Sequence, residues 1–132
     1  LVRSRGLGDV YKRQDLVNAL DHAVNGTLND VELEWDRRTA LGVVLAAHNY
    51  PETPRVGDVI TGIPTDTEDQ ITFHAGTKLQ DGKVVTSGGR VLCVVGLSDT
   101  VRGAQQKAYE VINHIQFDGM QYRKDIGYRA IK

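Results

Sequence analysis

The sequence is poor in several features that would point to particular classes of protein. It has a single cysteine, Cys93, so no internal disulfide can form, and we expect a small core side chain in a reducing, cytoplasmic compartment. No apolar run approaches membrane-spanning length and no signal-peptide pattern is present, so we expect no membrane partner. A formal net charge of −1 over 132 residues gives no global field that would favour nucleic acid. Any anion site must therefore be local.

Complete catalytic motifs are also missing. The sequence has no nucleophile elbow, no metal-ligand cluster and no complete P-loop, and its four histidines are scattered. The residues alone therefore predict no self-sufficient catalytic domain. The chain begins with Leu1 rather than Met, which favours a fragment of something longer. Residues 1–14 have no helical or strand period, and we expect a disordered or artefactual leader outside the fold.

What remains is an ordinary globular composition, 40% hydrophobic and 25% charged, in a length that suits one domain. Apolar spacing predicts a short helix over residues 15–26, with Asp15 as its cap. Residues 39–47 form a continuous apolar run, which is typical of a buried strand. Residues 57–64 predict a short strand or extended edge that Pro64 ends.

The second half of the chain contains a strong hairpin signal. Ile71 and Phe73 alternate with polar residues, which puts the two on one side of a strand. Asp81-Gly82 lies between extended segments, as in a β-hairpin. Residues 86–96 then end in an unbroken apolar run, which predicts a core strand buried on both faces.

The longest periodic segment follows and predicts an amphipathic helix, capped by one of residues 98–100. Its apolar positions recur at helical spacing: Val101, Ala104, Ala108, Val111, Ile112 and Ile115. Strands before a helix, with a hairpin among them, predict an α+β fold with a mostly antiparallel sheet and one or two packed helices.

A glycine pair next to a cation is the first candidate site. Gly88-Gly89 permits positive φ or a close approach of the backbone to another group, and Arg90 follows directly. One interpretation is a tight bend that leads into a core strand, with Arg90 solvated at its edge. The other is a backbone cradle beside an anion, with Arg90 at its rim.

The C-terminal tail is the second candidate site. Arg123, Lys124 and Arg129 concentrate positive charge in an otherwise neutral chain, and Gly127 follows the first two. The segment is either a solvated basic end or a clamp for phosphate or carboxylate, because Arg and Lys supply charge-assisted hydrogen bonds. Glycine turns near cations suit a small phosphorylated metabolite, bound at an interface with parts outside this chain.

Several longer segments carry a resemblance to a known family. They are residues 15–17, 41–47, 57–60, 73–77, 86–95, 104–109 and 117–131. In this order they resemble the C-terminal part of the phosphoribosylamine–glycine ligases, also called glycinamide ribonucleotide synthetases. The similarity covers residues 15–132, and it implies the C-terminal domain of an ATP-grasp enzyme, of the rudiment hybrid motif type.

The resemblance implies a reaction of de novo purine biosynthesis. ATP phosphorylates the carboxylate of glycine, and the amine of 5-phosphoribosylamine attacks the acyl phosphate, which yields glycinamide ribonucleotide, ADP and phosphate. Magnesium or manganese accompanies ATP in the full-length enzyme. The family's N-terminal domain and ATP-grasp core, with the acidic metal ligands, do not appear in this sequence. We therefore expect the chain to be inactive alone and to bind no cofactor or metal itself.

The resemblance also implies roles for the candidate residues. By analogy with related ATP-grasp ligases, Arg123 and Lys124 bind the ribose phosphate of phosphoribosylamine, and Gly88, Gly89 and Arg90 line the same cleft. No catalytic residue is expected in this chain.

Two other hypotheses stay open at this point. The first is a stand-alone, non-catalytic binding or interaction module on the same fold, which would need an exposed and continuous apolar face. The second is the C-terminal domain of a carboxylase-type ATP-grasp enzyme, which the tail over residues 123–131 argues against.

Overall fold

The computed structural model describes residues 7–32 and 36–131 and divides the chain into two compact units, Leu1–Arg37 and Arg38–Lys132. The first unit holds α1 (Leu7–Val24) and the 3-10 helix η1 (Leu28–Asp30). The second unit holds the remaining elements: β1 (Thr39–Ala46), β2 (Gln70–His74), β3 (Thr77–Gln80), β4 (Lys83–Thr86), β5 (Arg90–Ser98), α2 (Val101–Ile112) and the 3-10 helix η2 (Tyr128–Ala130). None of the helices in the described ranges is long and apolar enough to cross a membrane.

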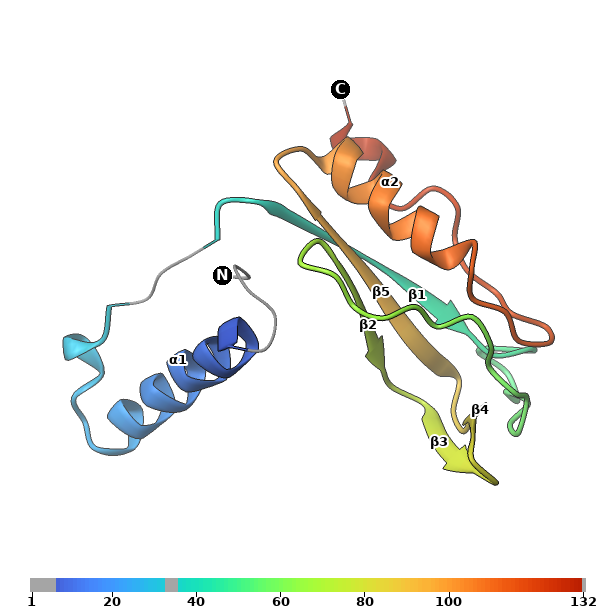
Figure 1. Ribbon diagram of the computed structural model, residues 1–132, viewed down its shortest axis with the longest axis horizontal. Helices are drawn as coiled ribbons and strands as arrows, with labels where there is room; N and C mark the ends of the chain where they lie inside the picture. The colour runs from blue at the N-terminus through green and yellow to red at the C-terminus, as the bar shows by residue number, and fades with distance from the viewer. Residues whose placement is uncertain (1–6, 33–35, 132) are drawn as a thin grey trace. The chain divides into compact units, whose positions relative to one another are not determined.

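The second unit is built on two antiparallel sheets, which confirms the predicted α+β class (Figure 1). One sheet has three strands in the order β1-β5-β2, and the other is the β3-β4 hairpin. Asp81 and Gly82 turn this hairpin with φ of 50° and 73°, which is the backbone that an Asp-Gly turn of this kind requires. The strand pair predicted around Asp81-Gly82 is therefore confirmed.

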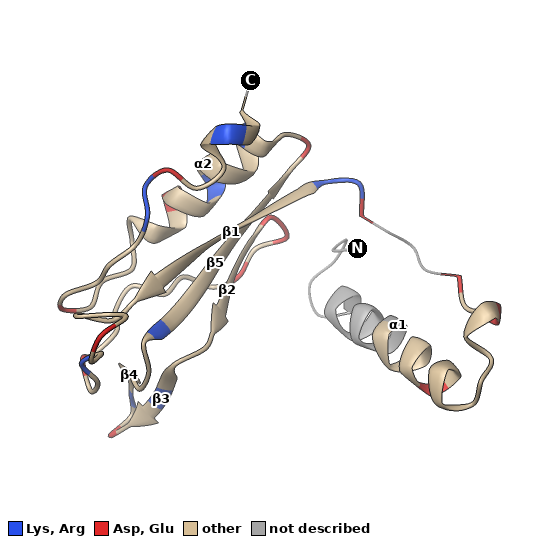
Figure 2. Ribbon diagram, turned by 180° about the vertical axis from the view of Figure 1, so that it is seen from behind, with Lys and Arg blue, Asp and Glu red and all other residues tan. Residues whose placement is uncertain are grey.

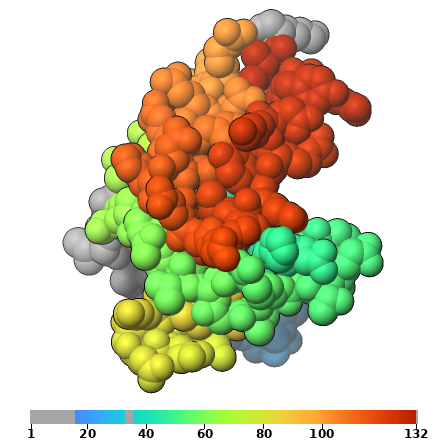
Figure 3. All heavy atoms as spheres, turned by 90° about the vertical axis from the view of Figure 1, so that its right-hand side faces the viewer, coloured from blue at the N-terminus to red at the C-terminus, as the bar shows by residue number. Residues whose placement is uncertain are grey.

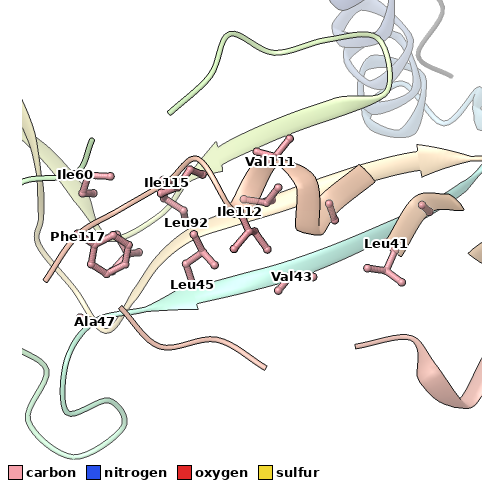
Figure 4. Close-up of a cluster of buried hydrophobic side chains, with 14 residues drawn as sticks. Leu41, Val43, Leu45, Ala47, Ile60, Leu92, Val111, Ile112, Ile115 and Phe117 are labelled. Carbon is pink, nitrogen blue, oxygen red and sulfur yellow. The ribbon is translucent and has the colours of Figure 1, made fainter. Parts of the chain in front are cut away.

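Helix α2 covers one face of the three-stranded sheet, and the core lies between them (Figure 4). Alternate residues of β1 point into this core, because Leu41, Val43 and Leu45 are buried while Val44 is exposed. The sheet meets the buried stripe of α2: Ala104, Ala108, Val111 and Ile112.

The other face of the sheet is apolar and only partly covered. The strand register puts Val44, Cys93 and Phe73 in one row across the three strands. Val44 is 43% exposed and Phe73 is 54% exposed, while Cys93 is half-buried. With Gly42, Ile71 and Val95 of the next row, these residues form what we call the outer face.

The outer face corrects two predictions made from apolar runs. Residues 39–47 and 86–96 are apolar enough to be buried on both faces, but on the outer face Val44 is exposed and Cys93 and Val95 are only half-buried. Cys93 is therefore not a core residue, although partial burial still raises the pKa of its thiol. Ile71 and Phe73 do share one side of β2, but the side turned to the core carries Thr72, because Thr72 lies opposite Val94.

Helix α2 begins as predicted. The Thr100 hydroxyl accepts a hydrogen bond of 3.0 Å from the Gly103 amide, which satisfies one of the free N–H groups of the first turn. The helix ends at Ile112, so Ile115 enters the core from the turn that follows rather than from the helix.

One other segment departs from its predicted boundaries, and another takes the second of its two predicted forms. Helix α1 begins at Leu7, so Asp15 lies inside it and is not its cap. Residues 1–6 of the predicted leader lie outside the described residues, and the prediction of a domain over residues 15–132 stays a prediction. Residues 57–64 form an extended edge without a strand, since only Val59 and Thr61 make isolated bridges there.

Candidate functional site

The end of β1 brings the two predicted site segments to the same part of the fold. Ala46 lies opposite Arg90 on one side, and on its other side it exchanges two backbone hydrogen bonds of 2.8 and 2.9 Å with Gln121. Neighbouring extended chains lie about 5 Å apart, so Arg90 and Gln121 are separated by about 10 Å. Arg123 and Lys124 follow Gln121 within a few residues. The glycine pair and the segment that leads into the basic tail, distant in sequence, therefore flank one strand end.

Arg123 is held by its own segment. Its Nε and Nη2 donate to the two carboxylate oxygens of Asp125 at 2.9 and 2.7 Å, and the Tyr109 hydroxyl donates to its backbone carbonyl at 2.6 Å. The hydrogen bond and charge of Asp125 raise the pKa of Arg123, and Arg123 in turn lowers the pKa of Asp125. The guanidinium is thus exposed but already oriented.

Lys124 and Arg90 are both exposed cations. Within the described part of the chain, neither side chain makes a hydrogen bond or an ion pair with another residue. An incoming anion would therefore meet no competing carboxylate at these two positions. Arg129 differs from these two cations, because its guanidinium lies over the Tyr128 ring at 5.6 Å from the ring centroid.

The glycine pair is explained by close packing rather than by unusual backbone angles. Neither Gly88 nor Gly89 has a positive φ. A Cβ on Gly89 would lie 2.5 Å from Cδ2 of Tyr50, and a Cβ on Gly76 would lie 2.8 Å from the Gly88 backbone. The structure thus places a tyrosine ring in the space that the missing side chain leaves. This geometry favours the tight bend over an open backbone cradle.

A loop that sequence reasoning did not single out lies beside both segments. We call residues 48–55 the bridging loop. His48 lies over Gly119, whose Cβ would come within 2.5 Å of the His48 Cβ, while Tyr50 lies over Gly89. Turn-forming residues and Pro51 mark the loop in the sequence, but its neighbours are not visible there. Figure 3 shows a hollow on this side of the molecule, between the red C-terminal segment and the turquoise and orange-red segments below it.

In residues 7–32 and 36–131, no group of three or more His, Cys, Asp or Glu side chains is arranged to hold a metal ion. A shallow pocket of about 250 Å³ opens at the start of α2, and none of the predicted site residues lines it. Figure 2 shows the charged residues of the second unit, with cations at the start of β5 and in the segment after α2.

Known proteins resemble this chain over most of its length. The family described as phosphoribosylglycinamide synthetase, C domain, matches residues 40–129. The phosphoribosylamine–glycine ligase of Ralstonia nicotianae is 68% identical over 120 residues, which are 91% of this chain and 28% of that protein. The ligase of Neisseria meningitidis serogroup A is 54% identical over 118 residues, with 89% and 28% covered.

A solved structure agrees with these matches. The crystal structure of the phosphoribosylamine–glycine ligase from Thermotoga maritima superposes with a TM-score of 0.74 at 40% identity, over 86% of this chain and 27% of that one. The chain thus spans about 28% of the length of the curated relatives it matches. Fold, sequence and the matched segment agree, and the chain belongs to the phosphoribosylglycinamide synthetase family, where it corresponds to the C domain.

Proposed function

We propose that this chain is the C-terminal part of an ATP-dependent ligase that joins glycine to 5-phosphoribosylamine in purine biosynthesis. The observation that carries the proposal is the 68% identity over 120 residues with a protein named phosphoribosylamine–glycine ligase. The chain's own contribution is one side of the cleft that receives the ribose phosphate. The remaining domains of the ligase, which lie outside this sequence, complete that cleft.

In the proposed reaction, ATP transfers its terminal phosphoryl group to the carboxylate of glycine. The amine of phosphoribosylamine then attacks the acyl phosphate, an amide bond forms, and phosphate leaves. This chain takes part by binding and orientation, because holding the amine close to the activated carboxyl removes much of the entropic cost of the second step.

The basic segment supplies the binding chemistry in this proposal. Among the residues that the structure describes, neither the Lys124 ammonium nor the Arg90 guanidinium has a partner, and Arg90 comes from the opposite side of the β1 end. Two of the five N–H donors of Arg123 are engaged by Asp125, so three are left for phosphate oxygens. Asp125 fixes the direction of that guanidinium in advance. Gly88 and Gly89 line the cleft as the tight bend that leads into Arg90, with Tyr50 packed against Gly89.

ATP and magnesium or manganese belong to the rest of the proposed ligase. The acidic and histidine residues that the structure describes do not form a group suited to a metal ion. No metal ligand is therefore assigned to the described residues of this chain.

The outer face supports a second candidate, a stand-alone interaction module. Such a module needs a continuous exposed apolar face, and Val44 and Phe73 provide one in the described structure. In a ligase, the same face would be covered by another domain. The gene sequence upstream of Asp15 separates the two candidates, since an in-frame ATP-grasp core supports the ligase and a start codon near Asp15 supports the module.

Enzyme assays test the proposal directly. The purified 132-residue chain, mixed with ATP, magnesium, glycine and phosphoribosylamine, is expected to release no ADP, whereas the longer chain encoded by the same gene turns over. ADP release by the short chain alone would contradict the assignment of chemistry to the other domains. A longer chain that does not consume phosphoribosylamine would contradict the ligase proposal itself.

A further inference from the structure

We propose that Arg55 is a positioning residue, which fastens the bridging loop to both sides of the candidate cleft. The inference rests on the proposed function, because the cleft is the one that would receive the ribose phosphate. The backbone of Arg55 contacts neither the glycine pair nor the basic tail, so any effect on them passes through the loop and the Arg55 side chain.

The bridging loop is closed at its base by Arg55 itself. The Arg55 amide donates to the His48 carbonyl at 3.0 Å, and inside the loop Asn49 Nδ2 donates to the Thr53 carbonyl at 3.3 Å. Asn49 has a φ of 63°, in the left-handed region that asparagine adopts more readily than most residues. The loop therefore has a defined internal path.

The loop contacts each side of the cleft through one side chain. Tyr50 packs on Gly89, next to Arg90, and His48 packs on Gly119, ahead of the basic tail. A displacement of the loop would therefore move groups on both sides at once.

The Arg55 side chain joins the same two sides by charge. Its Nε donates to Asp58 Oδ2 at 2.9 Å, and its Nη2 donates to the Asp118 carboxylate. Asp58 is tied in turn to Thr86, which is fully buried, through its amide to the Thr86 hydroxyl at 3.0 Å and its carbonyl to the Thr86 amide at 2.9 Å. One guanidinium thus links the segment before the glycine pair with the segment before Lys124.

Because these groups are exposed, their ion pairs should affect the position of the loop more than the stability of the fold. The side chains of Arg55 and Asp118 are 41% and 81% exposed, and exposed ion pairs change the stability of the folded state little. The two carboxylates also raise the pKa of Arg55, which keeps it charged throughout the working range. We therefore expect loss of Arg55 to act on substrate binding more than on folding.

The test uses the full-length ligase that carries this segment. Arg55→Met is expected to raise the KM for phosphoribosylamine at least threefold, while kcat and the KM for ATP and glycine stay within twofold and the thermal midpoint within about 3 °C. Arg55→Lys should recover part of the loss, since an ammonium still reaches one carboxylate. Asp118→Asn should raise the same KM and add little to Arg55→Met, because the two residues share one interaction. Lys78→Met, an exposed cation on β3, is the matched control and should change nothing.

Three results would overturn the inference. They are an unchanged KM for phosphoribosylamine in Arg55→Met, an equal rise of all three KM values, or additive effects of Arg55→Met and Asp118→Asn. If Arg55→Met does not fold, Arg55→Lys and Asp118→Asn carry the same comparison. A wild-type ligase that does not use phosphoribosylamine overturns the proposed function and this inference together. A wild-type ligase that uses it with an indifferent Arg55 overturns this inference alone.

Discussion

At the scale of single residues, the neighbouring cations Arg123 and Lys124 have different surroundings. Arg123 is paired with Asp125, whereas Lys124 has no partner in the described part of the chain. A sequence shows only two adjacent positive charges. The difference matters for the proposed phosphate site, because a phosphate must share Arg123 with a carboxylate but meets Lys124 alone.

The surroundings of a second charged group, Asp69, predict how the stability of the folded state depends on pH. Asp69 accepts hydrogen bonds of 2.7 Å from both Lys107 and Arg38, and these cations, Lys107 foremost, lower the pKa of Asp69 below its ordinary value of 3.8. Because the pKa of Asp69 is lower in the folded state, the ion pairs stabilise the folded state above about pH 4. This stabilisation is lost as the pH falls through the folded-state pKa. Asp69 is 41% exposed, so the contribution is about 1 kcal/mol at most.

The variant Asp69→Asn tests this contribution. It should be less stable than the original chain at pH 7, and the two should converge as the pH approaches 2, when urea unfolding is followed at each pH. A constant difference between the two chains from pH 7 to pH 2 would show that ionisation of Asp69 is not the cause.

At the scale of elements, the packing of α2 depends on a glycine in β5. A Cβ on Gly96 would lie 2.2 Å from the Ala104 carbonyl oxygen and 2.8 Å from the Ala108 amide, both backbone atoms of α2. Gly42, on the outer face of β1, would place a Cβ 3.2 Å from Cys93 Sγ, next to a side chain that can shift.

Substitution of these two glycines by alanine should therefore have very different effects. We expect Gly96→Ala to cost about 3 kcal/mol or more of unfolding free energy, since α2 must lift from the sheet, and Gly42→Ala to cost about 1 kcal/mol or less. Urea unfolding monitored by far-UV circular dichroism measures both. Equal costs for the two variants would contradict the packing of α2 on this face.

Local signals explain which elements the sequence could predict. Asp81-Gly82 specifies its own turn, and Thr100 with the spacing after it specifies α2. The face of β2 could not be predicted, because it is set by the register against β5 that buries Thr72 and exposes Phe73.

For the candidate site too, local signals predict some features, whereas others depend on contacts between distant parts of the chain. Charge and glycine content single out the basic tail and the glycine pair, but not the pairing of Ala46 with both Arg90 and Gln121. The bridging loop escaped prediction because its contacts, Tyr50 on Gly89 and His48 on Gly119, join residues far apart in the chain.

At the scale of the whole molecule, the second unit has a complete core on one side of its sheet and an apolar face on the other. An apolar sheet face of this kind usually marks an interaction surface. The chain spans about 28% of its relatives' length, so the proposed ligase has ample further chain to cover that face and to complete the cleft at the end of β1.

The most direct test of the central claim is the KM for phosphoribosylamine in the full-length ligase with Lys124→Ala. A lost hydrogen bond to a charged phosphate costs about 1.5–3 kcal/mol, so this KM should rise about 10- to 150-fold, while the KM for ATP and glycine stays unchanged. Lys124→Arg should retain most of the affinity, and Lys78→Ala should match the wild type. An unchanged KM for phosphoribosylamine in Lys124→Ala would remove this residue from the phosphate site and contradict the account.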